Sequence, residues 1–176
     1  MPILWLTGLP RSGKTTLARA VASRLGGNRP VEVLDGDDIR RHLSVDLGFS
    51  KADRDLNVQR VGYVARLLAR HDVFVIVAVV SPYAAARDEV RRLAGADQIP
   101  FFEVFLDARL ESLIERDTTG LYQKAIAGNV THFTGISDPY EAPSHPDLVI
   151  RTDEKSVAES VHAIVRALSQ RGLWMM

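Results

Sequence analysis

Short apolar runs alternate with segments of helical periodicity along the whole chain, and this alternation is the main signal for the fold. Residues 73–80 are apolar on both faces, as expected for a central strand of a parallel sheet. The full set of apolar runs predicts strands at 3–7, 31–34, 73–80, 101–106 and 148–150. Apolar residues three and four positions apart predict helices over 15–25, 58–71, around 90–93, over 110–114 and over 157–168. The pattern therefore indicates an α/β fold, with a five-stranded parallel sheet, helices on both faces and ligands at the carboxyl ends of the strands.

One connection is much longer than the others. Residues from about 116 to 146 form a polar, glycine-containing segment before the last predicted strand. A connection of this length is typical of a mobile lid over a binding site. The chain shows no internal repeat, low-complexity tract or Pro/Gly-rich linker. We therefore expect residues 1–176 to form a single domain that includes this lid.

Composition narrows the class of protein. Hydrophobic residues make up 46% and charged residues 25% of the chain, which is ordinary for a soluble globular enzyme. The formal net charge of zero argues against a general binder of nucleic acid or of an anionic membrane. The absence of cysteine excludes disulfides, thiol catalysis and cysteine–zinc sites. The apolar run at 73–80 is too short to cross a membrane, and no signal-peptide pattern precedes the first strand, so we expect a cytoplasmic protein.

A phosphate-binding loop follows the first predicted strand. Residues 8–15 read GLPRSGKT and fit the pattern G-x-x-x-x-G-K-[ST], between a strand and a helix as that pattern requires. Glycines let backbone N–H groups approach phosphate, Lys14 can reach the β- and γ-phosphates, and the Thr15 hydroxyl can hold Mg²⁺. The predicted architecture is thus a three-layer P-loop NTPase fold. The predicted cofactors are ATP and Mg²⁺. The residues expected to bind ATP are Gly8, Leu9, Pro10, Arg11, Ser12, Gly13, Lys14, Thr15 and Thr16.

Carboxylates follow two of the predicted strands. Asp35 and Asp37 come after the second strand, and in an extended segment they would point to opposite faces, one to Mg²⁺ and one to an acceptor hydroxyl. An Asp-Gly turn with a helix N-cap at Asp37 or Asp38 is the alternative, and the neighbouring phosphate loop favours the functional interpretation. Asp107 competes as the metal ligand because it too ends an apolar strand. The sequence leaves open which carboxylate binds the metal.

The polar segment 48–57 also has two interpretations. Ser50 and Asp53 could form a capping box ahead of the next helix. Alternatively, Phe49 offers a stacking face for a base, while Arg54 and Asn57, one helical turn apart, could bind an anionic nucleotide.

The remaining candidates lie at strand ends and before the lid. Ser81 closes the central strand, where a ligand-facing residue is expected, and it can also begin a helix with Pro82. Among Arg109, Arg116 and Asp117, we assign Arg116 to stabilise the transferring phosphoryl group. Several other charged, histidine and terminal residues are expected to be structural. They are Arg87, Arg91 and Arg92 as a solvated helix face, the five histidines 42, 71, 132, 145 and 162 as surface or packing residues, and 174–176 as a packed or frayed terminus.

In order and spacing, these stretches together resemble the adenylylsulfate kinase family. The matching segments are 8–16 (GLPRSGKTT), 34–40 (LDGDDIR), 48–61 (GFSKADRDLNVQRV), 81–87 (SPYAAAR), 102–107 (FEVFLD), 116–122 (RDTTGLY), 133–136 (FTGI) and 140–143 (YEAP). The resemblance implies transfer of the ATP γ-phosphate to the 3′-hydroxyl of adenylylsulfate, giving 3′-phosphoadenylylsulfate, the activated donor of sulfate assimilation. It also implies a homodimer.

The motif, the strand ends and the resemblance together give roles for individual residues. The expected catalytic residues are Lys14, Asp37, Arg116 and Ser81, and the expected metal site is Thr15 with Asp35. Asp37 would orient or deprotonate the acceptor hydroxyl. A phosphoserine intermediate is sometimes described at the position of Ser81, although in-line transfer needs only positioning and charge stabilisation. The implied substrate-binding residues are Asp37, Asp38, Ile39, Arg40, Phe49, Arg54, Asp55, Leu56, Asn57, Val80, Ser81, Thr119, His132 and Phe133.

Two departures from the family pattern bear on the acceptor. Thr119 stands where the family usually has lysine, and Asp38 stands where it usually has asparagine. Both changes make the pocket less favourable to a doubly anionic ligand. They keep open a related kinase acting on another nucleotide 3′-hydroxyl, such as a cytidine diphosphoramidate kinase. A non-catalytic nucleotide-binding regulatory protein is a further alternative, disfavoured by the presence of Asp35, Asp37 and Arg116.

Overall fold

The computed structural model describes residues 1–27 and 29–174, and it confirms the five-stranded parallel sheet. The strands are β1 (Ile3–Thr7), β2 (Val31–Asp35), β3 (Phe74–Ala78), β4 (Phe101–Asp107) and β5 (Leu148–Arg151), in the spatial order β2-β3-β1-β4-β5. β3 is shorter than the apolar run 73–80 predicted. Its pairing ends where Ala78 meets Leu6 of β1 and Asp35 of β2, and the chain then turns away from the sheet.

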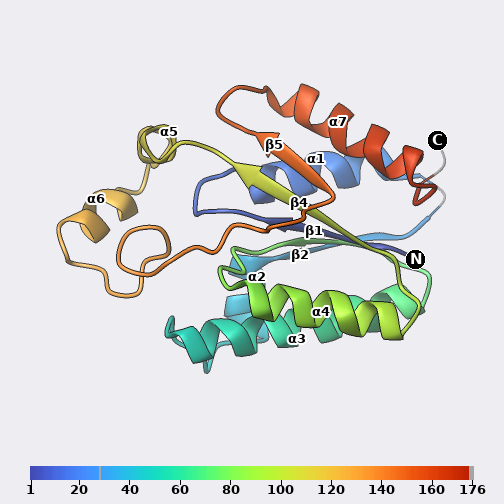
Figure 1. Ribbon diagram of the computed structural model, residues 1–176, viewed down its shortest axis with the longest axis horizontal. Helices are drawn as coiled ribbons and strands as arrows, with labels where there is room; N and C mark the ends of the chain where they lie inside the picture. Colours follow the sequence, from blue (N-terminus) through green and yellow to red (C-terminus); the bar gives the residue numbers. More distant parts are fainter. Residues whose placement is uncertain (28, 175–176) are drawn as a thin grey trace.

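Helices cover both faces of the sheet. They are α1 (Lys14–Leu25), α2 (Gly36–His42), α3 (Lys51–Arg70), α4 (Ala84–Ala96), α5 (Leu110–Glu115), α6 (Leu121–Ile126) and α7 (Val157–Gln170). Figure 1 shows α1 and α7 on one face and α3 and α4 on the other, which makes the predicted three layers. The short helices α2 and α6 were not predicted from apolar periodicity, although the alternative N-cap at Asp37 or Asp38 indicated a helix near α2.

Helix α3 begins two turns earlier than its apolar period indicated. The Ser50 hydroxyl accepts a hydrogen bond from the Asp53 amide and so caps the first turn at Lys51. The Ser50 hydroxyl also donates to the Asp53 carboxylate. The capping interpretation of segment 48–57 is therefore right about the backbone, and the polar first turns explain why the apolar pattern missed them.

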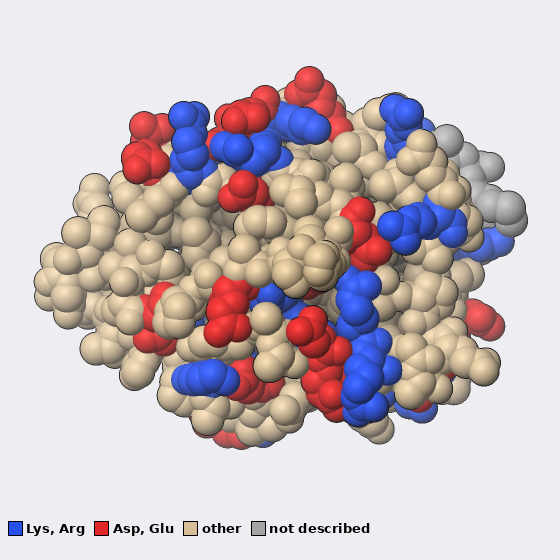
Figure 2. Space-filling model, viewed as in Figure 1, with Lys and Arg blue, Asp and Glu red and all other residues tan. Residues whose placement is uncertain are grey.

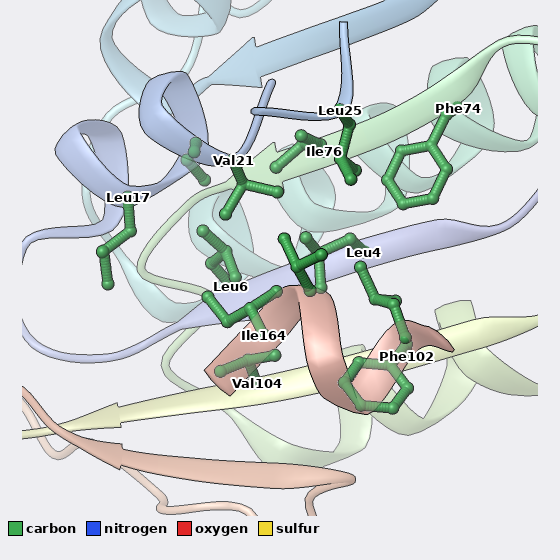
Figure 3. Packing of buried hydrophobic residues seen from close by; sticks show 14 of the residues in the cluster. Leu4, Leu6, Leu17, Val21, Leu25, Phe74, Ile76, Phe102, Val104 and Ile164 are labelled. Atoms are coloured by element: carbon green, nitrogen blue, oxygen red, sulfur yellow. The ribbon is translucent and has the colours of Figure 1, made fainter. Parts of the chain in front are cut away.

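Two apolar layers hold the helices to the sheet. Figure 3 shows the first layer, in which Leu17 and Val21 of α1 and Ile164 of α7 pack against Leu4 and Leu6 of β1. The second layer packs α3 and α4 against the other face, and Gly62 of α3 lies directly against Val90 of α4. Each fully buried Leu, Ile, Val or Phe side chain contributes about 1.5–3 kcal/mol relative to an exposed one. These two layers fix the carboxyl edge of the sheet, where the site lies.

A third, smaller cluster lies at that edge. Here we use the name lid segment for residues 116–146, which include α6. Tyr122 and Leu113 are buried in this cluster, with Phe133 and Leu9 packed against them. In Figure 1 the lid segment with α6 projects beyond the carboxyl ends of β1 and β4, away from both termini. Strand ends, phosphate loop and lid segment therefore meet at one edge of the sheet.

The charge distribution on the surface agrees with the composition. On the face shown in Figure 2, basic and acidic side chains are interspersed, as a net charge of zero allows. Across residues 1–27 and 29–174, no helix combines the length and the hydropathy that crossing a membrane requires.

Trp174 is buried and packs edge-on against Phe74, with ring centroids 5.2 Å apart. Met175 and Met176, also expected at a packed or frayed terminus, lie outside the described residues.

Candidate active site

The phosphate loop joins β1 to α1 in a conformation that two glycines permit. Gly8 has φ 154°, and a Cβ there would lie 2.5 Å from the Leu106 carbonyl oxygen, so any side chain would collide with backbone. Gly13 has φ 92° and caps α1, whose first residue is Lys14. The loop thus presents the N-terminus of α1, with its unpaired N–H groups, toward the cavity described below.

Lys14 is buried within the loop that carries it. Its Nζ donates to the carbonyls of Gly8 (3.0 Å) and Leu9 (2.7 Å) and to Ser12 Oγ (3.3 Å). Burial lowers the pKa of Lys14 to about 7, and the charges of Asp35 and Asp37 oppose that decrease. A cation held by loop oxygens beside two carboxylates is placed to exchange those partners for phosphate oxygens.

Asp35 and Asp37 face the same cavity, which corrects the prediction that they point to opposite faces. The segment is not extended, because Asp35 itself is the N-cap of α2 and its Oδ1 accepts from the Asp37 amide at 3.0 Å. The predicted N-cap at Asp37 or Asp38 is wrong by two or three residues for the same reason. Asp35 Oδ2 accepts from Thr15 Oγ1 at 2.6 Å. Asp107, the competing carboxylate, instead faces Arg151 at 3.5 Å and does not line the cavity.

A cavity of about 680 Å³ unites these groups. It is bounded by the phosphate loop, by Asp35 and Asp37, by Val80 after β3, and by Arg116 at the start of the lid segment. Arg116 is held in place by Thr152, the residue after β5, since Nη2 donates to the Thr152 carbonyl at 2.5 Å and Nη1 to the Thr152 hydroxyl. Four basic side chains (Arg11, Lys14, Arg116 and Lys155), two carboxylates and a helix N-terminus therefore converge on one volume.

A second group of predicted residues lies where the start of α3 meets the lid segment. Phe49 is 56% exposed, and its ring is flanked by the guanidinium groups of Arg40 (4.8 Å) and Arg54 (5.3 Å). Arg54 also donates to the Phe49 carbonyl and, at 2.5 Å, to the His132 carbonyl. Burial lowers the pKa of both arginines from the usual value, Arg40 and Arg54 alike. Arg40 is on α2, the helix that carries Asp37, but neither Arg40 nor the other residues of this group line the cavity.

Asn57 belongs to the same group. Its side chain is 7% exposed, and among the described residues its Oδ1 has no hydrogen-bond partner. A buried amide oxygen without a partner costs about 1–3 kcal/mol, so this atom is suited to accept from a bound ligand.

Other predicted substrate residues lie outside both the cavity lining and the group around Phe49. Asp38 is exposed and pairs with Arg41, and Ile39 is buried in the core. Asp55 accepts from Lys51, while Leu56 is partly exposed on α3. Phe133 packs edge-on against Tyr122 inside the lid segment, and the His132 ring faces Asp138.

Ser81 is directed into the protein. Its side chain is 3% exposed, its Oγ accepts from Trp5 Nε1 at 3.1 Å, and it donates to Thr7 Oγ1 at 3.0 Å. The backbone at Ser81 has φ 41°, in the left-handed region that most side chains avoid. The neighbouring Val80 lines the cavity and Ser81 does not. Ser81 is therefore held by buried hydrogen bonds to Trp5 and Thr7, and it lies outside the cavity lining.

Arg87 was expected on a solvated helix face, and that prediction is wrong. Its side chain is 2% exposed and forms a salt bridge with the buried Glu103 at 3.0 Å. It also donates to the carbonyls of Ser81 (2.6 Å) and Glu141 (2.7 Å). Arg91 also reaches Glu103, so of the three arginines Arg92 is the one on an exposed face. A glutamate within an otherwise apolar strand was the available sequence signal for a buried cationic partner.

The described residues contain no group of three or more His, Cys, Asp or Glu side chains arranged to hold a metal ion. Thr15 and Asp35 supply two oxygen donors at the cavity. Mg²⁺ is commonly bound by one or two protein oxygens together with substrate phosphates and water, so this pair fits that ion.

Comparison with known proteins agrees with this geometry. Residues 2–151 match the family model described as adenylylsulphate kinase. An adenylyl-sulfate kinase of Myxococcus xanthus is 54% identical over 171 residues, which cover 97% of this chain and 92% of that protein. An APS kinase of Mycobacterium tuberculosis, solved in complex with AMPPNP and APS, matches with a TM-score of 0.90 and 43% identity over 96% of this chain and 97% of that one.

More distant structures share the fold alone. A shikimate kinase of Aquifex aeolicus is 19% identical and has a TM-score of 0.56 over 98% of this chain and 99% of that one. The predicted P-loop kinase fold is therefore confirmed at two levels of similarity. With a family model covering most of its length and relatives above 50% identity, the chain belongs to the adenylylsulphate kinase family.

Proposed function

We propose that this protein transfers the γ-phosphate of ATP to the 3′-hydroxyl of adenylylsulfate. The observation that carries the proposal is the single cavity in which Lys14, Arg116, Asp35 and Asp37 meet the N-terminus of α1. The relative solved with AMPPNP and APS matches this chain over nearly its whole length, which supports a donor and an acceptor at the same edge of the sheet.

On the donor side, the loop amides and Lys14 bind the phosphates. Lys14 exchanges its bonds to the Gly8 and Leu9 carbonyls for phosphate oxygens, and a phosphate charge favours the protonated amine. Arg116 faces the same cavity and stabilises negative charge on the transferring group. Thr15 and Asp35 would hold Mg²⁺, which would supply charge neutralisation on the phosphate oxygens.

On the acceptor side, Asp37 orients and deprotonates the hydroxyl. It is exposed to the cavity at the first turn of α2, whereas Asp35 is occupied by Thr15 and by the cap of α2. Phe49 between two guanidinium groups offers a stacking surface for the base, and Asn57 Oδ1 offers a free acceptor. These groups support a nucleotide with an anionic substituent.

A coupled ADP-release assay with ATP, Mg²⁺ and adenylylsulfate tests the proposal. We expect turnover with adenylylsulfate, and a loss of at least about 100-fold in kcat for Asp37→Asn with ATP affinity retained, as removal of a catalytic base predicts. Arg92→Met is the matched control, because Arg92 is exposed on α4 away from the cavity. ATP binding without turnover on adenylylsulfate would refute the acceptor.

Thr119 and Asp38 make the acceptor panel necessary. The assay should therefore include a cytidine diphosphoramidate and other nucleotides with a free 3′-hydroxyl. Preferential turnover of one of these would assign the chain to a different acceptor within the same chemistry. Binding of ATP without transfer to any acceptor would instead indicate a regulatory nucleotide-binding protein.

We further propose one domain over residues 1–176, with residues 116–146 acting as a lid, in a cytoplasmic homodimer. A Thiobacillus denitrificans relative, of which this chain covers 30%, is described as hexameric, so assemblies differ among similar proteins. Sedimentation velocity of the purified chain distinguishes a dimer from a monomer or hexamer.

A further inference from the structure

The first half of the phosphate loop contacts the lid segment through three consecutive residues. The Leu9 side chain packs against Gly135, where a Cβ would lie 2.6 Å from Leu9 Cδ2. The Pro10 carbonyl accepts from the Tyr122 hydroxyl at 2.9 Å. Arg11 is the third and longest-reaching contact. The loop therefore supports the lid as well as lining the cavity.

Arg11 bonds to two residues of the lid base, which is residues 117–122 at the start of the lid segment. Its Nε and Nη2 both lie 3.2 Å from Asp117 Oδ1, and Nη2 donates to Thr119 Oγ1 at 2.6 Å. The backbone of Arg11 has φ 64°, a left-handed conformation that glycine adopts freely and that is strained for arginine. Glycine would satisfy the loop backbone better, so the role of arginine here must come from its side chain.

Asp117 is the centre of the lid base. Its side chain is 2% exposed, and it accepts from the Thr119 amide, the Thr119 hydroxyl and the Tyr122 amide as well as from Arg11. The first three donors belong to the lid segment itself and shape the start of α6. Arg11 is the one among these partners that belongs to the phosphate loop, so it joins the folded lid base to the donor site.

We propose that Arg11 is a positioning residue that fastens the base of the lid to the phosphate loop through Asp117. The inference rests on the proposed function, because it explains how the occupied donor site holds the lid over the acceptor. The carbonyls of Gly8 and Leu9, which bind Lys14, lie in the same loop as the lid contacts. A rearrangement of the loop on phosphate binding is therefore passed to Asp117 and α6.

Amide hydrogen exchange of the lid segment tests the fastening without any assay of activity. We expect exchange in residues 117–128 to be about tenfold faster in both Arg11→Ala and Arg11→Gly, since each removes a charge-assisted, partly buried contact. The matched control is Arg109→Ala, which removes another arginine–aspartate pair, Arg109–Asp153, outside the cavity lining. It should leave that exchange unchanged.

The two Arg11 variants separate side chain from backbone. Arg11→Gly relieves the left-handed strain, so its melting temperature should equal or exceed that of Arg11→Ala while the lid exchanges equally fast. Faster exchange in Arg11→Gly alone would assign the effect to glycine freedom and overturn the proposal. Exchange within twofold of wild type in both variants would also overturn it.

Steady-state kinetics then tests whether the contact between Arg11 and Asp117 affects phosphoryl transfer. We expect kcat/KM for the acceptor to fall about tenfold in Arg11→Ala, and Arg11→Lys to recover part of the loss, because lysine keeps the charge and lacks the fork. If wild type transfers phosphate to no nucleotide acceptor but the lid still loosens in both variants, the proposed function fails and the fastening stands. If wild type is active and lid exchange is unchanged, the fastening fails and the function stands.

Discussion

Replacing Arg87 by methionine should destabilise the protein more than any comparable change on α4. The guanidinium of Arg87 neutralises the buried Glu103 and donates to the carbonyls of Ser81 and Glu141. Methionine keeps most of the aliphatic stem and removes all three interactions. It leaves a buried carboxylate with Arg91 as its remaining cation, at 3.2 Å.

The magnitude follows from the burial of both partners. Removing one member of a buried ion pair costs about 3–5 kcal/mol, and a buried carbonyl without its donor adds about 1 kcal/mol or more. We expect a loss of about 4 kcal/mol in the free energy of unfolding, against a total of about 5–15 kcal/mol for a domain. At this chain length, that loss corresponds to a fall of about 10 °C in Tm.

Arg92→Met is the matched control on the same helix. Arg92 pairs with Glu89 one turn away and its side chain is 64% exposed, so its loss should cost less than about 0.5 kcal/mol. Both substitutions are Arg→Met within α4, so differences in helix propensity cancel. Glu103→Gln added to Arg87→Met should recover about 1–2 kcal/mol, because a neutral amide is less costly to bury than an uncompensated carboxylate.

Urea unfolding monitored by tryptophan fluorescence and far-UV circular dichroism measures these differences. Trp5 reports directly on the region, since its Nε1 donates to Ser81, whose carbonyl Arg87 binds. Equal destabilisation by Arg87→Met and Arg92→Met would refute the reasoning. So would a double variant with Glu103→Gln that is less stable than Arg87→Met alone.

Three further predictions follow from contacts elsewhere in the fold. Gly62→Ala should cost about 1 kcal/mol in urea unfolding, because overpacking against Val90 Cγ2, 2.6 Å from the new Cβ, outweighs about 1 kcal/mol of helix propensity. Adding Val90→Ala should make the pair less destabilised than the sum of the single changes, and simple additivity would contradict the contact. Ser81→Ala should transfer phosphate within tenfold of wild type, because the hydroxyl is bonded to Trp5 and Thr7, and phosphoserine found there by mass spectrometry during turnover would contradict this. Burial alone would raise the pKa of Asp117. Hydrogen bonds from the Tyr122 amide and from the Thr119 hydroxyl and amide, with the charge of Arg11, outweigh burial and hold this pKa at about 2. Its carboxylate therefore stabilises the fold above about pH 4, and the Tm difference between wild type and Asp117→Asn should narrow as pH falls from 4 toward 2; a constant difference would contradict the assignment.

The sequence pattern was sufficient to predict features that depend on residues close together in the chain. The glycine and lysine spacing of 8–15 identified the phosphate loop, and the apolar runs identified the parallel sheet. The cap at Ser50 was also readable as an alternative, because a cap involves residues three apart. The loop and the cap involve partners close in sequence, and each strand is marked by its own apolar run, so all three could be predicted from local pattern.

Long-range neighbours were not readable in the same way. Sequence placed Asp35 and Asp37 on opposite faces of an extended segment, but the cap of α2 by Asp35 turns both toward one cavity. Asp107 and Asp35 both end apolar strands, and β4 with Asp107 is the direct neighbour of β1; it is the packing of α1 over β2 that brings Thr15 to Asp35.

The sequence by itself therefore determined the fold class, the phosphate-loop motif and the family, because these depend on periodicity and on contiguous motifs. The tertiary structure decided that Arg87 is a buried partner of Glu103, that Ser81 faces Trp5, and that Arg11 reaches Asp117, 106 residues away. The physical reason is that burial and ion pairing depend on which elements pack together, and the sequence separation between such partners carries no periodic signal.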